Sequence, residues 1–213
     1  MNLDTWKLLL DGAWVTLYVS AAAIALGVPI GLLIAAGRVS KLPVLSQALA
    51  MYVTLARATP LVTLTLFIFL AAPSFGIQIN RVAAAIMALT ANTAAFNAEI
   101  WRSAFIGFAR EQREAAYACG MTRWVFFRRI MLPQVIVNSL PALVSEMSFL
   151  IKASPAVAVI GIVDLTRVTN RITSVTYEPL PPILAAAVLY MLMIGGLLKL
   201  QQLLEFKARR LAV

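Results

Sequence analysis

The sequence predicts an all-α membrane protein of about five transmembrane helices, and three observations lead to this fold class. The composition is strongly apolar, long apolar stretches recur along the chain, and basic residues gather in alternate connections between them. Of the 213 residues, 62% are hydrophobic and 13% are charged, whereas soluble domains are about half apolar and about a quarter charged. A core of this size cannot bury that excess, so we expect lipid to cover much of the apolar surface.

Five apolar stretches are long enough to cross a bilayer as helices, which takes about 20 mostly apolar residues. They cover residues 13–36, 46–72, 82–105, 134–151 and 182–204. The first stretch is longer than the apolar region of a signal peptide and follows Asp4 and Asp11 rather than positive charge, so we expect a retained span. Residues 153–181 are apolar at first and then polar, which fits either a re-entrant piece or a short extracytoplasmic helix.

Basic residues alternate between the connections and orient the predicted bundle. On one side they are Arg38, Lys41, Arg102, Arg110, Arg113, Arg123, Arg128, Arg129, Lys199, Lys207, Arg209 and Arg210. On the other side, the connection between the second and third stretches carries only Arg81. Arg167 and Arg171 also fall on that side, but they lie beside the acidic residues Asp164 and Glu178. Cytoplasmic connections carry the excess of Lys and Arg, so the N-terminus is expected outside and the C-terminus in the cytoplasm. The net charge of +9 therefore indicates membrane orientation rather than nucleic-acid binding.

The residue inventory excludes several kinds of chemistry. A single cysteine, Cys119, rules out an internal disulfide and a cysteine-built metal site. The absence of histidine rules out histidine catalysis and histidine-ligated zinc. The sequence contains no P-loop, so ATP hydrolysis is not expected on this chain, and its scattered carboxylates offer little acid–base chemistry. We therefore expect neither catalytic residues nor a metal site.

Small residues in the first span predict a close helix contact. Gly27 and Gly31 are four residues apart, and Ala35 continues the same spacing. This pattern lets another helix approach closely, although it also fits the general richness of membrane helices in glycine and alanine.

The longest cytoplasmic connection, about residues 106–133, is expected to form two short helices separated by breaks. Residues 111–118 are helix formers, and Gly120 suits the left-handed end of a helix. Thr122 is placed to cap a second short helix, which Pro133 is expected to end. A paired-helix hook of this kind would suit docking to a soluble partner.

This connection resembles the EAA loop of permease subunits in bacterial ABC importers. The resemblance is carried by Glu-Ala-Ala at 114–116, Gly120, and Ile-Met-Leu-Pro at 130–133. It implies a coupling helix around residues 120–124 that sits in a groove of a separate ATP-hydrolysing subunit. The residues assigned to coupling are Glu114, Ala115, Ala116, Gly120, Met121, Thr122, Leu132 and Pro133. The resemblance also implies that ATP and Mg bind the partner ATPase, and that this chain itself holds no cofactor.

Other stretches narrow the resemblance to the polar amino acid uptake family of histidine, glutamine and arginine-type permeases. Arg-Ala-Thr-Pro at 57–60 is similar to that family's Arg-Gly-Thr-Pro. The remaining similar stretches are residues 92–102, 145–146, 150–154 and 164–165. Ala153 replaces the family's aspartate and Pro155 interrupts the next turn, so the chain could pair with itself or with a homologous subunit that carries more of the site.

The resemblance implies a single MetI-like domain of the type I ABC importers over residues 1–213, in the bacterial cytoplasmic (inner) membrane. Its expected function is to move a polar amino acid into the cytoplasm. The implied partners are ABC ATPase subunits, a second permease subunit, an extracytoplasmic solute-binding protein and membrane lipid, with no nucleic acid. Import of another polar solute, such as an opine or an ectoine-like compound, stays open, as does a channel or scaffold without ATP coupling.

Polar side chains within or between the apolar stretches are the candidates for substrate contact, because a charge at the centre of a bilayer costs ~2.5–3.5 kcal/mol on insertion scales. These candidates are Asp164, Glu146, Asn92, Asn97 and Ser154. Structural alternatives stay open for them. Asp164 could pair with Arg167 and Glu146 with Lys152, while the two asparagines could hydrogen-bond neighbouring helices.

Overall fold

The computed structural model describes residues 2–40 and 42–211, with side chains up to Leu203, so Lys41, Lys207, Arg209 and Arg210 lie outside the described side chains. Within these ranges every regular element is helical, which confirms the all-α prediction. The α-helices are α1 (Leu3–Val39), α2 (Pro43–Ala58), α3 (Leu61–Ala71), α4 (Arg81–Ile106), α5 (Arg110–Ala118), α6 (Arg123–Phe126), α7 (Leu132–Ala153), α8 (Leu165–Thr176) and α9 (Leu180–Leu211). Short 3-10 turns follow α3 (Ala72–Phe75) and α7 (Ser154–Ile160), and a π turn (Phe127–Met131) joins α6 to α7.

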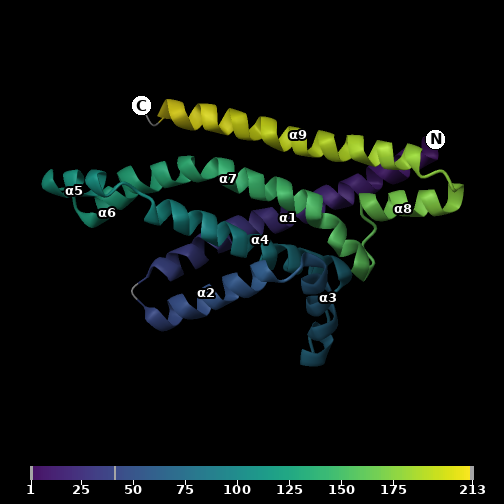
Figure 1. Cartoon of the computed structure of the whole chain (residues 1–213), viewed down its shortest axis with the longest axis horizontal. Helices are drawn as coiled ribbons and strands as arrows, with labels where there is room; N and C mark the ends of the chain where they lie inside the picture. Colours follow the sequence, from purple (N-terminus) through teal and green to yellow (C-terminus); the bar gives the residue numbers. More distant parts are fainter. Residues whose placement is uncertain (1, 41, 212–213) are drawn as a thin grey trace.

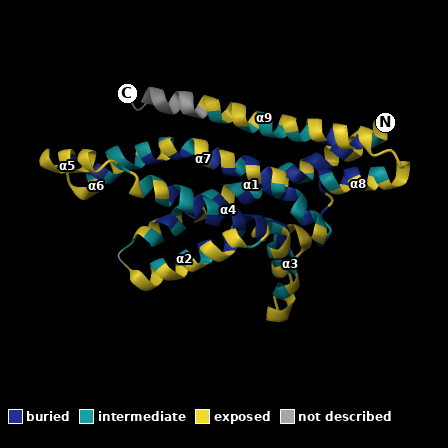
Figure 2. Cartoon of the chain, viewed as in Figure 1, coloured by how far each residue is buried: buried dark blue, intermediate teal, exposed yellow. Residues whose placement is uncertain are grey.

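The long helices form a bundle around α1 and α4, which pack along one another (Figure 1). α7 lies beside α4 and carries α9 on its outer side, while α2 and α3 pack against α4 from another direction. α5 and α6 project at one end, and α8 lies against α1 at the opposite end. Buried residues gather on α1, α4 and the inner face of α7, whereas α2 and the described part of α9, up to Leu203, are largely exposed and α3 buries only Thr65 (Figure 2).

The contact between α1 and α4 is made close by glycine. A Cβ added to Gly27 would lie 2.2 Å from Thr93 Cγ2, and one added to Gly31 would lie 2.7 Å from Asn97 Cβ. Ala35, one turn further on, is fully buried. The structure therefore confirms the close helix contact that the spacing of small residues predicts.

Three described stretches are long and apolar enough to cross a membrane, namely residues Leu3–Val39, Arg123–Ile160 and Leu180–Leu203. α2 and the stretch after it (61–75) provide a fourth if they count as one span, although they are bent by 112° at the break around Pro60. The predicted third span corresponds to α4, which is long but carries buried polar residues such as Asn92 and Asn97. The number of five spans and the orientation of the termini stay predictions.

Residues 153–181 contain a separate short helix, α8, while its extracytoplasmic position stays a prediction. The 3-10 turn after α7 ends at Gly161, and α8 then packs Leu165 and Val168 against Leu9 and Ala13 of α1. α8 is amphipathic, because Leu165 and Val168 are buried while its arginines and Asn170 are exposed.

The expectation that Pro133 ends the second short helix is wrong. The chain continues from α6 through the π turn into α7, where Pro133 occupies the first turn. Proline lacks an N–H and crowds the preceding turn, but it is tolerated where a helical segment begins. The N–H of Leu132 bonds to the Phe127 carbonyl in the wider π register. This widened turn directly before Pro133 lets the helix bend rather than stop.

Candidate functional site

The projecting end of the bundle is a hook made of α5, α6 and the turn between them, residues 110–126. The hook turns at Gly120, whose φ of +74° is left-handed. The Gly120 N–H donates to the Tyr117 carbonyl (3.0 Å) and the Met121 N–H to the Ala116 carbonyl (3.1 Å). Thr122 Oγ1 accepts a hydrogen bond from the Val125 N–H at 3.3 Å and so caps α6. Both predictions for this turn, the left-handed glycine and the threonine cap, are confirmed.

The two helices of the hook are in contact through the rings of Tyr117 and Phe126, whose centroids lie 5.5 Å apart, and Ala116 and Phe126 are buried. The tip is exposed, including 66% of Trp124 and 38% of Met121. An exposed tip on a packed base is suited to insertion into another protein.

The residues assigned to coupling do not all lie at this tip. Glu114 and Ala115 are exposed on α5, and Glu114 pairs with Arg110 at 2.7 Å. Ala116, Gly120, Met121 and Thr122 form the end of α5 and the turn. Leu132 and Pro133 begin α7 instead, beyond the π turn. The structure therefore groups six of the eight residues and separates the last two.

A polar groove of about 650 Å³ lies between α2, α4 and α7 and extends to the start of α5. Its polar or charged lining residues are Arg57, Glu99, Ser103, Gln112, Gln134, Asn138 and Ser139. Glu99 is held there by two arginines from different helices, Arg38 at the end of α1 and Arg102 one turn along α4. The sequence suggests no link between Arg38 and Glu99, because they lie 61 positions apart.

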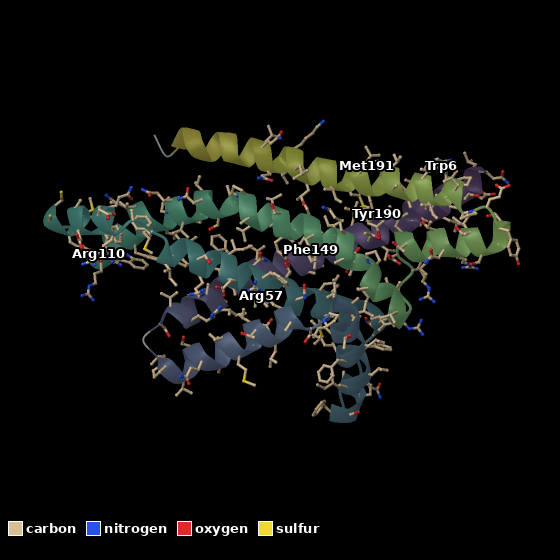
Figure 3. All side chains as sticks on the ribbon, viewed as in Figure 1. Trp6, Arg57, Arg110, Phe149, Tyr190 and Met191 are labelled. Carbon is tan, nitrogen blue, oxygen red and sulfur yellow. The ribbon has the colours of Figure 1, made fainter. Side chains whose placement is uncertain are left out.

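A cationic side chain, the exposed Arg57 of α2, lines this groove, and an anionic side chain is buried on α7 beyond it. The Arg57 guanidinium lies 5.1 Å above the ring of Phe96, and that ring lies 6.4 Å from the ring of Phe149 (Figure 3). Glu146 is buried on α7, one turn beyond the lining residue Ala142, and its Oε1 has no hydrogen-bond partner among the described residues. No salt bridge joins Arg57 and Glu146 in the part of the chain that the structure describes.

The expected alternative pairing of Glu146 with Lys152 is absent from the described residues, where Lys152 is exposed. The two asparagines bond within the bundle. Asn92 Nδ2 donates to the Ala56 carbonyl at 3.4 Å, and Asn97 Nδ2 donates to Thr93 Oγ1 at 3.3 Å. Asn97 Oδ1 stays without a hydrogen-bond partner in the described part of the chain.

Asp164 and Ser154 belong to a different cluster, near α8. The Asp164 carboxylate is buried and caps α8, accepting hydrogen bonds from the N–H groups of Thr166 (3.3 Å) and Arg167 (3.0 Å). The Arg167 guanidinium donates to the Ala158 carbonyl instead of pairing with Asp164. Ser154 Oγ donates to the Ile151 carbonyl at 2.8 Å. Both side chains thus have local structural partners.

Arg57, Phe96 and Phe149 are not among the substrate-contact candidates that the sequence predicts, although Arg57 belongs to the Arg-Ala-Thr-Pro stretch. The available signal is a cation three residues before Pro60 in an apolar stretch, whereas aromatic residues are common in membrane helices. Residues 2–40 and 42–203 contain no group of three His, Cys, Asp or Glu residues arranged to hold a metal ion.

Comparison with known proteins places these features in context. The family described as "Binding-protein-dependent transport system inner membrane component" matches residues 27–210. The chain is 32% identical to the glutamine transport system permease protein GlnP of Escherichia coli (strain K12), over 87% of this chain and 85% of that protein. It is 30% identical to the arginine transport system permease protein ArtQ of Bacillus subtilis (strain 168), with the same coverage. Its fold matches the crystal structure of an amino acid ABC transporter with histidines, with a TM-score of 0.88, 35% identity and 96% of each chain covered.

Proposed function

This chain belongs to the family of binding-protein-dependent transport system inner membrane components, and we propose that the solute it carries is a polar amino acid. As a member of this family it is the permease subunit of an ABC importer in the bacterial inner membrane. It is not itself an enzyme, because the ATPase of such importers is a separate subunit. Importers of this family work with that ATPase and with a solute-binding protein.

The proposal that the solute is an amino acid rests on the similarity of nearly the whole chain to a solved amino acid ABC transporter, at 35% identity. The charged side chains in and next to the groove, Arg57 and Glu146, support it. A free amino acid is a zwitterion, and Arg57 and Glu146 offer one charge for its carboxylate and one for its ammonium group. The unpartnered oxygen of Glu146 is a buried acceptor that a substrate ammonium would satisfy. Asn92 and Asn97 lie on α4 beside this site and are proposed to orient the substrate.

The polar groove is proposed to be this chain's part of the solute path. It leads from Arg57 and Phe96 towards α5, so a solute released at the centre would leave along side chains that can hydrogen-bond it. Asp164 and Ser154 would act on this path indirectly, by holding α8 and the turn that follows α7. A second permease, identical or homologous, is proposed to complete the path.

The hook is proposed to couple the permease to the ATPase. Its exposed tip around Met121 and Trp124 would enter a groove of that subunit, which binds ATP and Mg. Glu114, Ala115, Ala116, Gly120 and Thr122 would shape the tip. Leu132 and Pro133 would transmit its movement into α7, because α6 continues into α7 without a break.

Uptake by membrane vesicles containing the complete importer tests the proposal. Vesicles loaded with ATP and supplied with the solute-binding protein would be given labelled glutamine, arginine, histidine and ectoine in turn. We expect ATP-dependent accumulation of at least one amino acid. Accumulation of ectoine alone would show that the solute is a different polar compound and not an amino acid. Flux without ATP would indicate a channel.

A further inference from the structure

A second crevice, of about 710 Å³, lies at the basic end of the bundle and takes no part in the solute path proposed above. It is bounded by the ends of α1 and α4, the start of α5 and the π turn before α7. All these elements meet at the end from which the hook projects (Figure 1). Under the positive-inside rule this end faces the inner leaflet of the membrane.

The walls of this crevice are apolar and open outwards. Val39 and Ile106, at the ends of α1 and α4, are 48% and 61% exposed. The rings of Phe105 and Phe127 stack at 6.5 Å and form the wall between α4 and the π turn. Such a surface in contact with water would be costly, so it is suited to a hydrocarbon chain.

The mouth of the crevice is positively charged. Arg110 and Arg113, both exposed on α5, line it. Arg113 has no hydrogen-bond or ion-pair partner among residues 2–40 and 42–203. Arg110 pairs with Glu114, but both are largely exposed, and a surface pair of this kind contributes only ~0–1 kcal/mol. Arg110 is therefore free to turn to a stronger anionic partner.

The backbone adds to this positive potential. α5 has nine residues and begins at Arg110, and its N-cap residue Ala109 has no side-chain acceptor for the first N–H groups of the helix. The N-terminus of a helix carries partial positive charge, which favours a phosphate nearby. The charged mouth and the apolar walls thus match the two parts of a phospholipid.

We propose that this crevice binds one anionic phospholipid of the inner leaflet. Its phosphate lies between Arg110 and Arg113, and an acyl chain runs along Phe105, Phe127 and Ile106. A lipid bound there contacts α5 and the π turn at once, so it supports the hook from the membrane side. The proposal rests on the chain's place in the inner membrane and not on the identity of the solute.

Lipid binding to the purified importer tests this site. The chain, purified with the subunits that accompany it and stripped of lipid, would be titrated with phosphatidylglycerol or phosphatidylcholine of the same acyl chains, and bound lipids counted by native mass spectrometry. We expect preferential retention of phosphatidylglycerol. Because one arginine near anionic lipid contributes about fivefold to binding, Arg110→Gln with Arg113→Gln should lose about 25-fold. Arg128→Gln with Arg129→Gln removes the same charge from the neighbouring π turn, outside the crevice, and should leave binding unchanged.

A second variant separates the acyl chain from the headgroup. Ala36 is exposed on the crevice wall, so Ala36→Phe fills it without changing any charge and should also weaken phosphatidylglycerol binding. A retained thermal transition would show that each variant is folded. Equal binding of phosphatidylcholine, full competition by glycerol phosphate, or unchanged lipid retention in both crevice variants would overturn the proposal. The proposal would also be overturned if the arginine variants no longer co-purified with the ATPase subunit but still bound the lipid. The two arginines would then contact that subunit rather than the lipid.

Discussion

At the residue scale, the site between α2, α4 and α7 holds two charged side chains without ion-pair partners in the described part of the chain, the exposed Arg57 and the buried Glu146. Arg57 rests on the ring of Phe96, and Glu146 is buried with one oxygen unpaired. Glu99, by contrast, is neutralised by Arg38 and Arg102 and ties α1 to α4. Unpaired buried polar atoms are costly, and their retention in a membrane helix points to a role in function rather than in packing.

Glu146→Gln should weaken solute uptake without unfolding the protein. The substitution keeps the size of the side chain but removes the charge proposed to hold the substrate's ammonium group. A hydrogen bond to a charged group contributes about 1.5–3 kcal/mol, so half-saturation for the amino acid should rise about tenfold or more. Initial rates of uptake across substrate concentrations would measure this. Glu178→Gln makes the same change at an exposed position and serves as control; equal effects of both variants would argue against the site.

At the scale of elements, backbone geometry determines how the helices meet and turn. α1 and α4 touch through glycines, the hook turns at a left-handed glycine, and a π turn carries the chain past Pro133. Each of these features depends on a few consecutive residues, yet each determines how whole helices lie relative to one another.

Gly31→Ala should loosen the contact between α1 and α4. Its Cβ would lie 2.9 Å from the Ala94 carbonyl oxygen and 3.0 Å from the Ala98 nitrogen, and backbone atoms cannot move aside. Overpacking of this kind costs about 1–3 kcal/mol, so the Tm of the purified chain should fall. Gly195→Ala is the matched control, because a Cβ there has nothing within 4 Å and alanine favours the helix. An unchanged Tm for Gly31→Ala would mean that the two helices are not in close contact.

Gly120→Val should block transport while the bundle stays intact. A β-branched residue is strained at a φ of +74°, although a Cβ there would meet no atom within 4 Å, so the damage is confined to the turn of the hook. ATP-dependent uptake should be lost with little change in Tm. Gly76→Val creates the same strain at a φ of +75° in a turn outside the hook, again with no atom in reach, and should keep transport. Normal uptake by Gly120→Val would contradict the coupling role of this turn.

At the scale of the whole molecule, much of the surface is apolar and needs lipid or a second subunit. The described part of α9, up to Leu203, is largely exposed, and α3 extends away from the bundle after the 112° bend (Figures 1 and 2). These surfaces leave room for a paired permease, while the hook at one end and α8 at the other face opposite sides of the membrane in the predicted orientation.

The single cysteine offers a direct test of that orientation. Cys119 is exposed at the end of α5, and no other thiol competes with it. A membrane-impermeant maleimide should label it in inside-out vesicles and not in intact cells. In a Cys119→Ser background, Thr176→Cys at the end of α8 should show the reverse pattern. Labelling of Cys119 from outside the cell would invert the predicted topology.

By itself the sequence determined the all-α membrane class, the two-helix hook with its left-handed Gly120 and Thr122 cap, and the close contact made by Gly27 and Gly31. These features follow from hydrophobicity and from backbone preferences that act over a few neighbouring residues. Only the tertiary structure decided that Arg38 pairs with Glu99, that Asp164 caps α8 rather than pairing with the Arg167 guanidinium, and that α6 runs through a π turn past Pro133. Side-chain partners depend on where whole helices cross, and those crossings result from packing summed over the entire bundle rather than from any local pattern.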